Sequence, residues 1–105
     1  MANEFFTQLR PNAGSPAEIY LSTTLVKISY LYVTNTSDAD IRVSVYIAPQ
    51  EQSFGRSTAL IWREEILSND FDILLGYRIP LFPGTRVGVW TSASKAATFT
   101  VFGEL

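Results

Sequence analysis

The sequence contains neither cysteine nor histidine, and these two absences exclude several kinds of site. Without cysteine the chain has no disulfide bond, no thiolate metal site and no cysteine nucleophile. Without histidine it lacks the commonest general base and the commonest ligand of transition metals. We therefore expect no metal and no other cofactor, and we expect stability to come from packing.

Lysine is also scarce, because Lys27 and Lys95 are the only two. Lys27 lies within an expected strand and Lys95 in a loop of small residues, and neither position is typical of a catalytic lysine. Carboxylates occur as close pairs in expected turns or as direct neighbours in the chain, which is a poor arrangement for acid–base catalysis. These pairs are Asp38 with Asp40, Glu64 with Glu65, and Asp70 with Asp72. We expect no catalytic residues and no enzymatic activity.

The chain has no excess of positive charge and no long apolar run. Ten acidic and eight basic residues give a formal charge of −2, and the basic residues are spread along the sequence. A nucleic-acid groove needs a basic stripe, so we expect no nucleic-acid partner. No stretch approaches the roughly 18 apolar residues that span a bilayer, and no signal-peptide pattern opens the chain. We expect no membrane partner, and synthesis in the cytoplasm without export.

What is present indicates one folded β domain. The 105 residues are 47% hydrophobic and only 17% charged, which is typical of a single globular domain. Apolar and polar residues alternate with a period of two along short segments separated by turn formers. The expected strands are residues 19–22, 25–34, 40–48, 59–67, 71–75, 78–82, 85–92 and 98–103. The segment 59–67 also allows a helical interpretation, but its shortness favours a strand.

Two connections between these strands are typical of hairpins. Residues 35–40, NTSDAD, are turn formers between two long strands, and the second of these strands places Val43 in the core. The same residues offer calcium ligands, but they are also ordinary turn residues, and we favour the turn. Small residues separate strands 85–92 and 98–103, which predicts a hairpin with Val89 in the core and Trp90 and Phe102 on the opposite face.

Seven or eight short strands with turns between them predict an all-β fold, an antiparallel β-sandwich of jelly-roll or Ig-like type, over residues 17–105. Residues 1–16 contain two prolines and a glycine, and they predict an extended N-terminal arm without a strand. Phe5 and Phe6 are too apolar to leave in water, so this arm is expected to dock on a neighbouring subunit. The alternative is a frayed terminus. Either way, deleting residues 1–15 is expected to leave the melting temperature nearly unchanged.

Aromatic residues make up 13% of the chain, and those outside the expected core are the candidates for a binding surface. They lie on the less apolar faces of strands, near strand ends or in the arm. Exposed aromatic rings suit either a protein contact or a sugar platform, and the sequence does not separate the two. The candidate interaction residues are Phe5, Phe6, Tyr46, Trp62, Tyr77, Trp90 and Phe102.

From residue 20 to residue 105 the chain resembles a group of small virion proteins of tailed phages. The resemblance is carried by YVTNTSDAD at 32–40, by the glycine-containing turn at 81–85, and by the closing pattern at 99–104. The sequence departs from the group at residues 22–24, where Ser-Thr-Thr replaces a Pro-Ala-Gly turn, and residues 1–16 have no counterpart in it.

This resemblance implies a non-enzymatic structural protein of a phage particle. The function it favours most is that of a capsid cement or decoration protein, a homotrimer that binds the major capsid protein on the capsid surface of the virion. The second function that it allows is that of a component of the tail or its fibres. A carbohydrate-binding module that uses Trp62 or Trp90 is a third possibility of a different class, and a hydrolase is the most remote.

Overall fold

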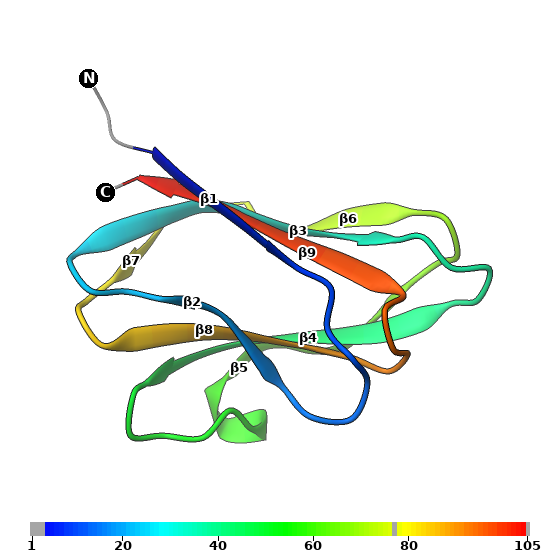
Figure 1. Ribbon diagram of the computed structural model, residues 1–105, viewed down its shortest axis with the longest axis horizontal. Helices are drawn as coiled ribbons and strands as arrows, with labels where there is room; N and C mark the ends of the chain where they lie inside the picture. The colour runs from blue at the N-terminus through cyan, green and yellow to red at the C-terminus, as the bar shows by residue number, and fades with distance from the viewer. Residues whose placement is uncertain (1–3, 77, 105) are drawn as a thin grey trace.

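The computed structural model describes residues 4–76 and 78–104, and this part of the chain forms nine strands in two antiparallel sheets that pack face to face (Figure 1). Sheet A has the order β1 (Glu4–Leu9), β9 (Ala97–Glu104), β3 (Val26–Asn35) and β6 (Phe71–Leu75), and β7 (Ile79–Leu81) also pairs with β3. Sheet B has the order β2 (Ala17–Leu21), β8 (Thr85–Thr91), β4 (Ile41–Pro49) and β5 (Ala59–Ile66). A short 3-10 turn, η1 (Arg56–Thr58), precedes β5. Within the described residues, no helix has the length and hydrophobicity needed to cross a membrane.

The connections follow the jelly-roll order. The chain alternates between the sheets from β1 to β4, forms a hairpin from β4 to β5, and alternates again from β7 to β9 (Figure 1). β6 and β7 together occupy one strand position beside β3. The predicted all-β antiparallel sandwich is therefore confirmed, with the jelly-roll rather than the Ig-like order of strands.

Both predicted hairpins are wrong. β3 and β4 belong to different sheets, as do β8 and β9, so residues 36–40 and 92–96 form corners between sheets (Figure 1). Val89 and Phe99 do share one core, but they approach it from opposite sheets. The turn residues suit a hairpin and a corner equally well, because alternation shows which face is buried and not which strand lies beside it. Residues 59–66 form strand β5, as predicted.

The predicted arm without a strand is also wrong. Residues 4–9 form β1, which pairs with β9 in unbroken register from Glu4 opposite Glu104 to Leu9 opposite Phe99. The prolines lie after β1, in the connection to β2, and do not interrupt the pairing. Phe5 turns inward and stacks on Tyr20 of β2, with 4.4 Å between ring centroids. Burial raises the pKa of the Tyr20 hydroxyl. Phe5 therefore joins the two sheets of its own domain.

A bulge in β3 decides which of its side chains enter the core. The register with β9 shifts between Ile28 and Tyr30. Before the shift Ile28 is buried, and after it Leu31 and Val33 are buried while Tyr30 is half exposed. Strict period-two alternation puts Ile28 and Tyr30 on one face of the strand, but the extra residue between them places the two side chains on opposite faces. Val43, predicted to lie in the core, is fully buried there.

Asn35, at the end of β3, is a fully buried polar residue that joins two turns. Its side-chain nitrogen lies 2.8 Å from the Ala39 carbonyl oxygen, 3.2 Å from that of Ile66 and 3.1 Å from that of Leu67. Its Oδ1 accepts hydrogen bonds from the backbone N–H and the hydroxyl of Ser37. Asn35 and Ser37 thus make hydrogen bonds to backbone groups of the two turns. The described part of the chain contains no group of three or more acidic residues placed to hold a metal ion.

We expect Asn35→Ala to lower the free energy of unfolding by about 3 kcal/mol, because several buried backbone groups lose their partner at once. Urea unfolding of the purified domain measures the change. Asn12→Ala is the matched control, since Asn12 is exposed, and it is expected to change stability by less than about 0.5 kcal/mol. Equal stability of the two variants would contradict the structural role of Asn35.

Candidate interaction surfaces

The outer face of sheet A carries a continuous group of apolar side chains. Phe6 of β1 lies opposite Phe102 of β9, and Phe102 lies opposite Tyr30 of β3. The next pair continues the group, because Tyr32 of β3 lies opposite Ile73 of β6. We define the aromatic face as the six outward side chains of these four strands: Phe6, Tyr30, Tyr32, Phe71, Ile73 and Phe102.

The aromatic face is large for a domain of this size. Phe71 is 64% exposed, Phe6 56%, Ile73 53%, Tyr30 50% and Phe102 36%. At about 200 Å² for a fully exposed large side chain, these residues leave on the order of 500 Å² of apolar surface in water. The largest patch on a typical monomer is about 300–600 Å² and is often functional. The aromatic face is therefore the strongest candidate for a protein contact.

The rings of the aromatic face pack on one another, which holds them in place. The centroids of Phe6 and Phe102 are 5.0 Å apart, and those of Tyr32 and Phe102 are 5.9 Å apart. Aromatic side chains also lose few rotamers on binding, so a surface of packed rings is prepared for contact before a partner arrives.

A groove of about 580 Å³ lies at one end of the aromatic face. Tyr30 and Phe102 contribute to its lining, together with three charged residues, Glu4, Arg78 and Glu104. Glu4 and Glu104 face each other across β1 and β9, and Arg78 reaches Glu104 with 3.6 Å between nitrogen and oxygen. Arg78 offsets the repulsion between two like charges placed directly opposite. The groove thus adds a charged rim to an apolar surface, as protein interfaces commonly have.

The outer face of sheet B has a different character, because four of the eight basic residues gather there. The guanidinium carbon of Arg63 lies 4.9 Å from the ring centroid of Trp62 and 4.6 Å from that of Trp90. Arg56 lies 5.6 Å from the Trp62 ring. We define the arginine face as the four arginines and two tryptophans: Arg42, Arg56, Arg63, Arg86, Trp62 and Trp90. The basic residues are scattered in the sequence and clustered in the fold.

A bulge in β5 places Arg63 between the two tryptophans. The register between β4 and β5 shifts between Val43 and Val45, and Arg63 takes the left-handed conformation with φ of 54°. The buried Ser44 hydroxyl accepts a hydrogen bond of 2.9 Å from the Arg63 N–H, and Arg42 donates to the Arg63 carbonyl. Left-handed backbone costs roughly 1–2 kcal/mol at a residue other than glycine, and these hydrogen bonds hold it.

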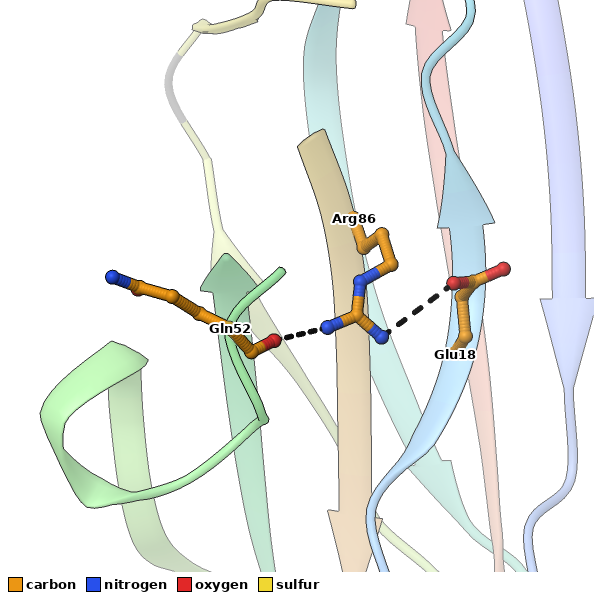
Figure 2. Close-up of polar contacts among 3 residues, drawn as sticks. All are labelled: Glu18, Gln52 and Arg86. Carbon is orange, nitrogen blue, oxygen red and sulfur yellow. Dashed lines mark hydrogen bonds and ion pairs between the residues drawn. The ribbon is translucent and has the colours of Figure 1, made fainter. Parts of the chain in front are cut away.

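Arg86 forms the opposite end of the arginine face. Figure 2 shows its guanidinium between Glu18 of β2 and the loop that contains Gln52. It donates to the Gln52 carbonyl, lies 3.8 Å from a Glu18 carboxylate oxygen, and is stacked over Phe54 with 4.3 Å to the ring centroid. Its Nε is buried without a hydrogen-bond partner among the described residues. Phe54 in turn covers Gly88, where an added Cβ would lie 2.6 Å from the ring.

The structure distributes the predicted interaction residues and adds others. Phe6 and Phe102 belong to the aromatic face, and Trp62 and Trp90 to the arginine face. Tyr46 is only 3% exposed, because Phe54 and Trp62 cover it. Phe5 lies between the sheets, and Tyr77 lies outside the described residues.

Sequence reasoning missed two groups of surface residues. The bulge in β3 turns Tyr30 to the outer face against the period-two alternation of the strand, and Phe71 and Ile73 lie on a strand too short for a clear pattern. The arginines showed no sequence clustering to detect. Comparison of the chain with protein-family models, with curated proteins and with solved structures finds no match.

Proposed function

We propose that this protein is a non-enzymatic structural protein of a phage virion, a cement or decoration protein that binds the major capsid protein as a homotrimer. The observation that carries the proposal is the aromatic face, an exposed apolar surface across four strands of sheet A. The resemblance of residues 20–105 to small virion proteins is the reason for proposing a location in the phage particle. Jelly rolls are common in viral capsid proteins but also in lectins, so the fold is compatible with this function without selecting it.

The size of the aromatic face supports binding by several copies at once. Covering about 500 Å² of apolar surface contributes on the order of 10 kcal/mol before other terms. Association costs an estimated 4–15 kcal/mol in lost freedom, so a single copy binds weakly through this face alone. Linking three copies makes the second and third contacts intramolecular and raises the overall affinity strongly. A trimer on a repeating shell is therefore the arrangement that uses such a face well.

We expect the double variant Phe6→Ser/Phe71→Ser to bind capsid shells at least about tenfold more weakly than the parent protein, because it removes the two most exposed rings of the aromatic face. Cosedimentation of purified protein with shells that lack it measures the affinity. Phe82→Ser is the matched control, since Phe82 is 65% exposed but lies outside the aromatic face. Unchanged binding by the double variant would contradict the proposed contact.

The number of copies per particle distinguishes a head protein from a tail protein. A cement protein is expected in hundreds of copies in purified virions, measured by quantitative mass spectrometry against the major capsid protein. A few copies per particle would instead place the protein in the tail or its fibres. Absence from purified virions would overturn the proposal.

A carbohydrate-binding module is the second candidate, and Trp62 is the observation in its favour, because this residue is 37% exposed. The guanidinium carbons of Arg63 and Arg56 lie 4.9 Å and 5.6 Å from the centroid of that ring, so a sugar would share it with two guanidinium groups. Binding to a glycan array that Trp62→Ala abolishes, without loss of the fold, would favour this candidate over the capsid protein.

A further inference from the structure

Three arginines of the arginine face form no ion pair with a carboxylate of the described residues. Among the described residues, the ion pairs within 4 Å are Arg78 with Glu104 and Arg86 with Glu18. Arg42, Arg56 and Arg63 are exposed and take part in neither. Two of these guanidinium groups lie over the Trp62 ring, with their carbons 5.6 Å (Arg56) and 4.9 Å (Arg63) from its centroid, and a guanidinium binds carboxylates through its N–H groups. Glu65 lies opposite Arg42 in the register of β4 and β5, but neither it nor any other described carboxylate comes within 4 Å of these three guanidinium groups. They can therefore bind a carboxylate of another chain.

The conformation of Arg63 supports a binding role for this face. A strained residue other than glycine persists where the surrounding structure holds it, and such residues cluster at binding sites. Here the hydroxyl of buried Ser44 and the guanidinium of Arg42 both bond to the Arg63 backbone. The strain orients one charged side chain against two rings at once.

Carboxylates that form no ion pair among the described residues lie at one end of the same molecule. Asp38 and Asp40 are exposed in the β3–β4 corner, and Asp70 and Asp72 are exposed at the start of β6. The two segments are joined, because the Ser68 N–H donates to Asp40 Oδ1 at 2.9 Å. We define these four residues as the aspartate end. None of them forms an ion pair within 4 Å among the described residues.

We propose that the aspartate end of one copy binds the arginine face of a second copy. The proposal rests on the homotrimer of the proposed function and specifies its interface. In a trimer each copy gives its aspartate end to one neighbour and its arginine face to the other, which is a head-to-tail contact that closes into a ring. Glu64 and Glu65 are exposed beside Arg63, and they would repel a polyanion, which carries negative charge along its whole length. A few aspartate side chains on a protein surface can bind the arginines without lying against these two glutamates.

The first test is the salt dependence of self-association. Sedimentation equilibrium at about 50 mM salt is expected to show species larger than the 11.7 kDa monomer, and at about 1 M salt their dissociation constant is expected to rise at least tenfold, because the Debye length falls from above 10 Å to about 3 Å. A monomer at both salt concentrations would overturn the proposal. So would an oligomer that salt does not weaken, which would point to the aromatic face instead.

The second test uses two complementary variants. Arg42→Gln/Arg63→Gln removes charge from the arginine face, and Asp38→Asn/Asp40→Asn/Asp70→Asn removes it from the aspartate end. Each variant alone is expected to be monomeric and to melt cooperatively. Mixed together they retain one intact surface each, and they are expected to form a 1:1 heterodimer. Lys27→Gln, a charge removal on sheet A, is the control and is expected to assemble like the parent.

The outcomes of this experiment are distinct. A mixture that stays monomeric, although both variants melt cooperatively, would overturn the head-to-tail interface, and misfolded variants are recognised by their melting curves before mixing. Binding of heparin or duplex DNA that Arg42→Gln/Arg63→Gln abolishes, by a parent protein that stays monomeric, would assign the face to a polyanion. If oligomers form as expected but never bind capsid shells, the proposed function fails and the interface stands.

Discussion

Val43→Asp is expected to prevent folding. Val43 is fully buried in β4, between Thr91 of β8 and Glu64 of β5 in the register of sheet B, and its side chain belongs to the apolar core. An unpaired carboxylate in such a core costs several kcal/mol, and the lost valine packing adds about 2 kcal/mol. This approaches the 5–15 kcal/mol that stabilises an ordinary small domain. Circular dichroism and a thermal melt of the purified variant measure the result.

Two companions make this prediction specific. Val89→Asp in β8 is expected to behave in the same way, because Val89 is fully buried opposite Val45 of the neighbouring strand. Arg42→Asp, one residue before Val43, is expected to fold, because Arg42 is exposed. A soluble Val43→Asp protein with a cooperative melt would mean that the core is not where the structure places it.

Deletion of residues 1–10 is expected to destabilise the domain severely. It removes β1, exposes the edge of β9 and takes Phe5 away from Tyr20. Phe5 also packs directly on Gly103, where an added Cβ would lie 2.2 Å from its ring. Lost apolar burial and strand hydrogen bonds together cost on the order of 5 kcal/mol. A shift of this size corresponds to about 20 °C or more in the melting temperature of a domain of this length.

This result would be the opposite of what the sequence predicts for residues 1–15. The matched pair Phe5→Ala and Phe6→Ala resolves the cause with single substitutions at neighbouring positions. Phe5→Ala is expected to cost about 3 kcal/mol, and Phe6→Ala, at a residue 56% exposed on the outer face, less than about 1 kcal/mol. Urea unfolding measures both values. If the truncated protein melted like the full chain, β1 would contribute nothing to the domain and the arm interpretation would return.

The sequence by itself determined the fold class and most strand positions. Period-two alternation reports local burial, since successive side chains of a strand point to opposite faces whatever strand lies alongside. For this reason the ranges 25–34 and 40–48 correspond closely to β3 (Val26–Asn35) and β4 (Ile41–Pro49), and Val43 lies in the core. The absence of cysteine and histidine likewise excludes disulfide bonds and sites built on these residues whatever fold the chain adopts.

Only the tertiary structure decided how the strands are paired and what their outer faces carry. The corners after β3 and β8 contain the residues of a hairpin, and the choice between the two depends on contacts with distant strands. Residues 4–9 form strand β1 because their backbone pairs with the edge of β9, although prolines follow closely in the sequence. The bulges at Ser29 and Arg63 reverse or re-aim side chains, and they bring residues far apart in sequence onto one surface. Such surfaces arise from long-range pairing, which leaves no periodic signal in the chain.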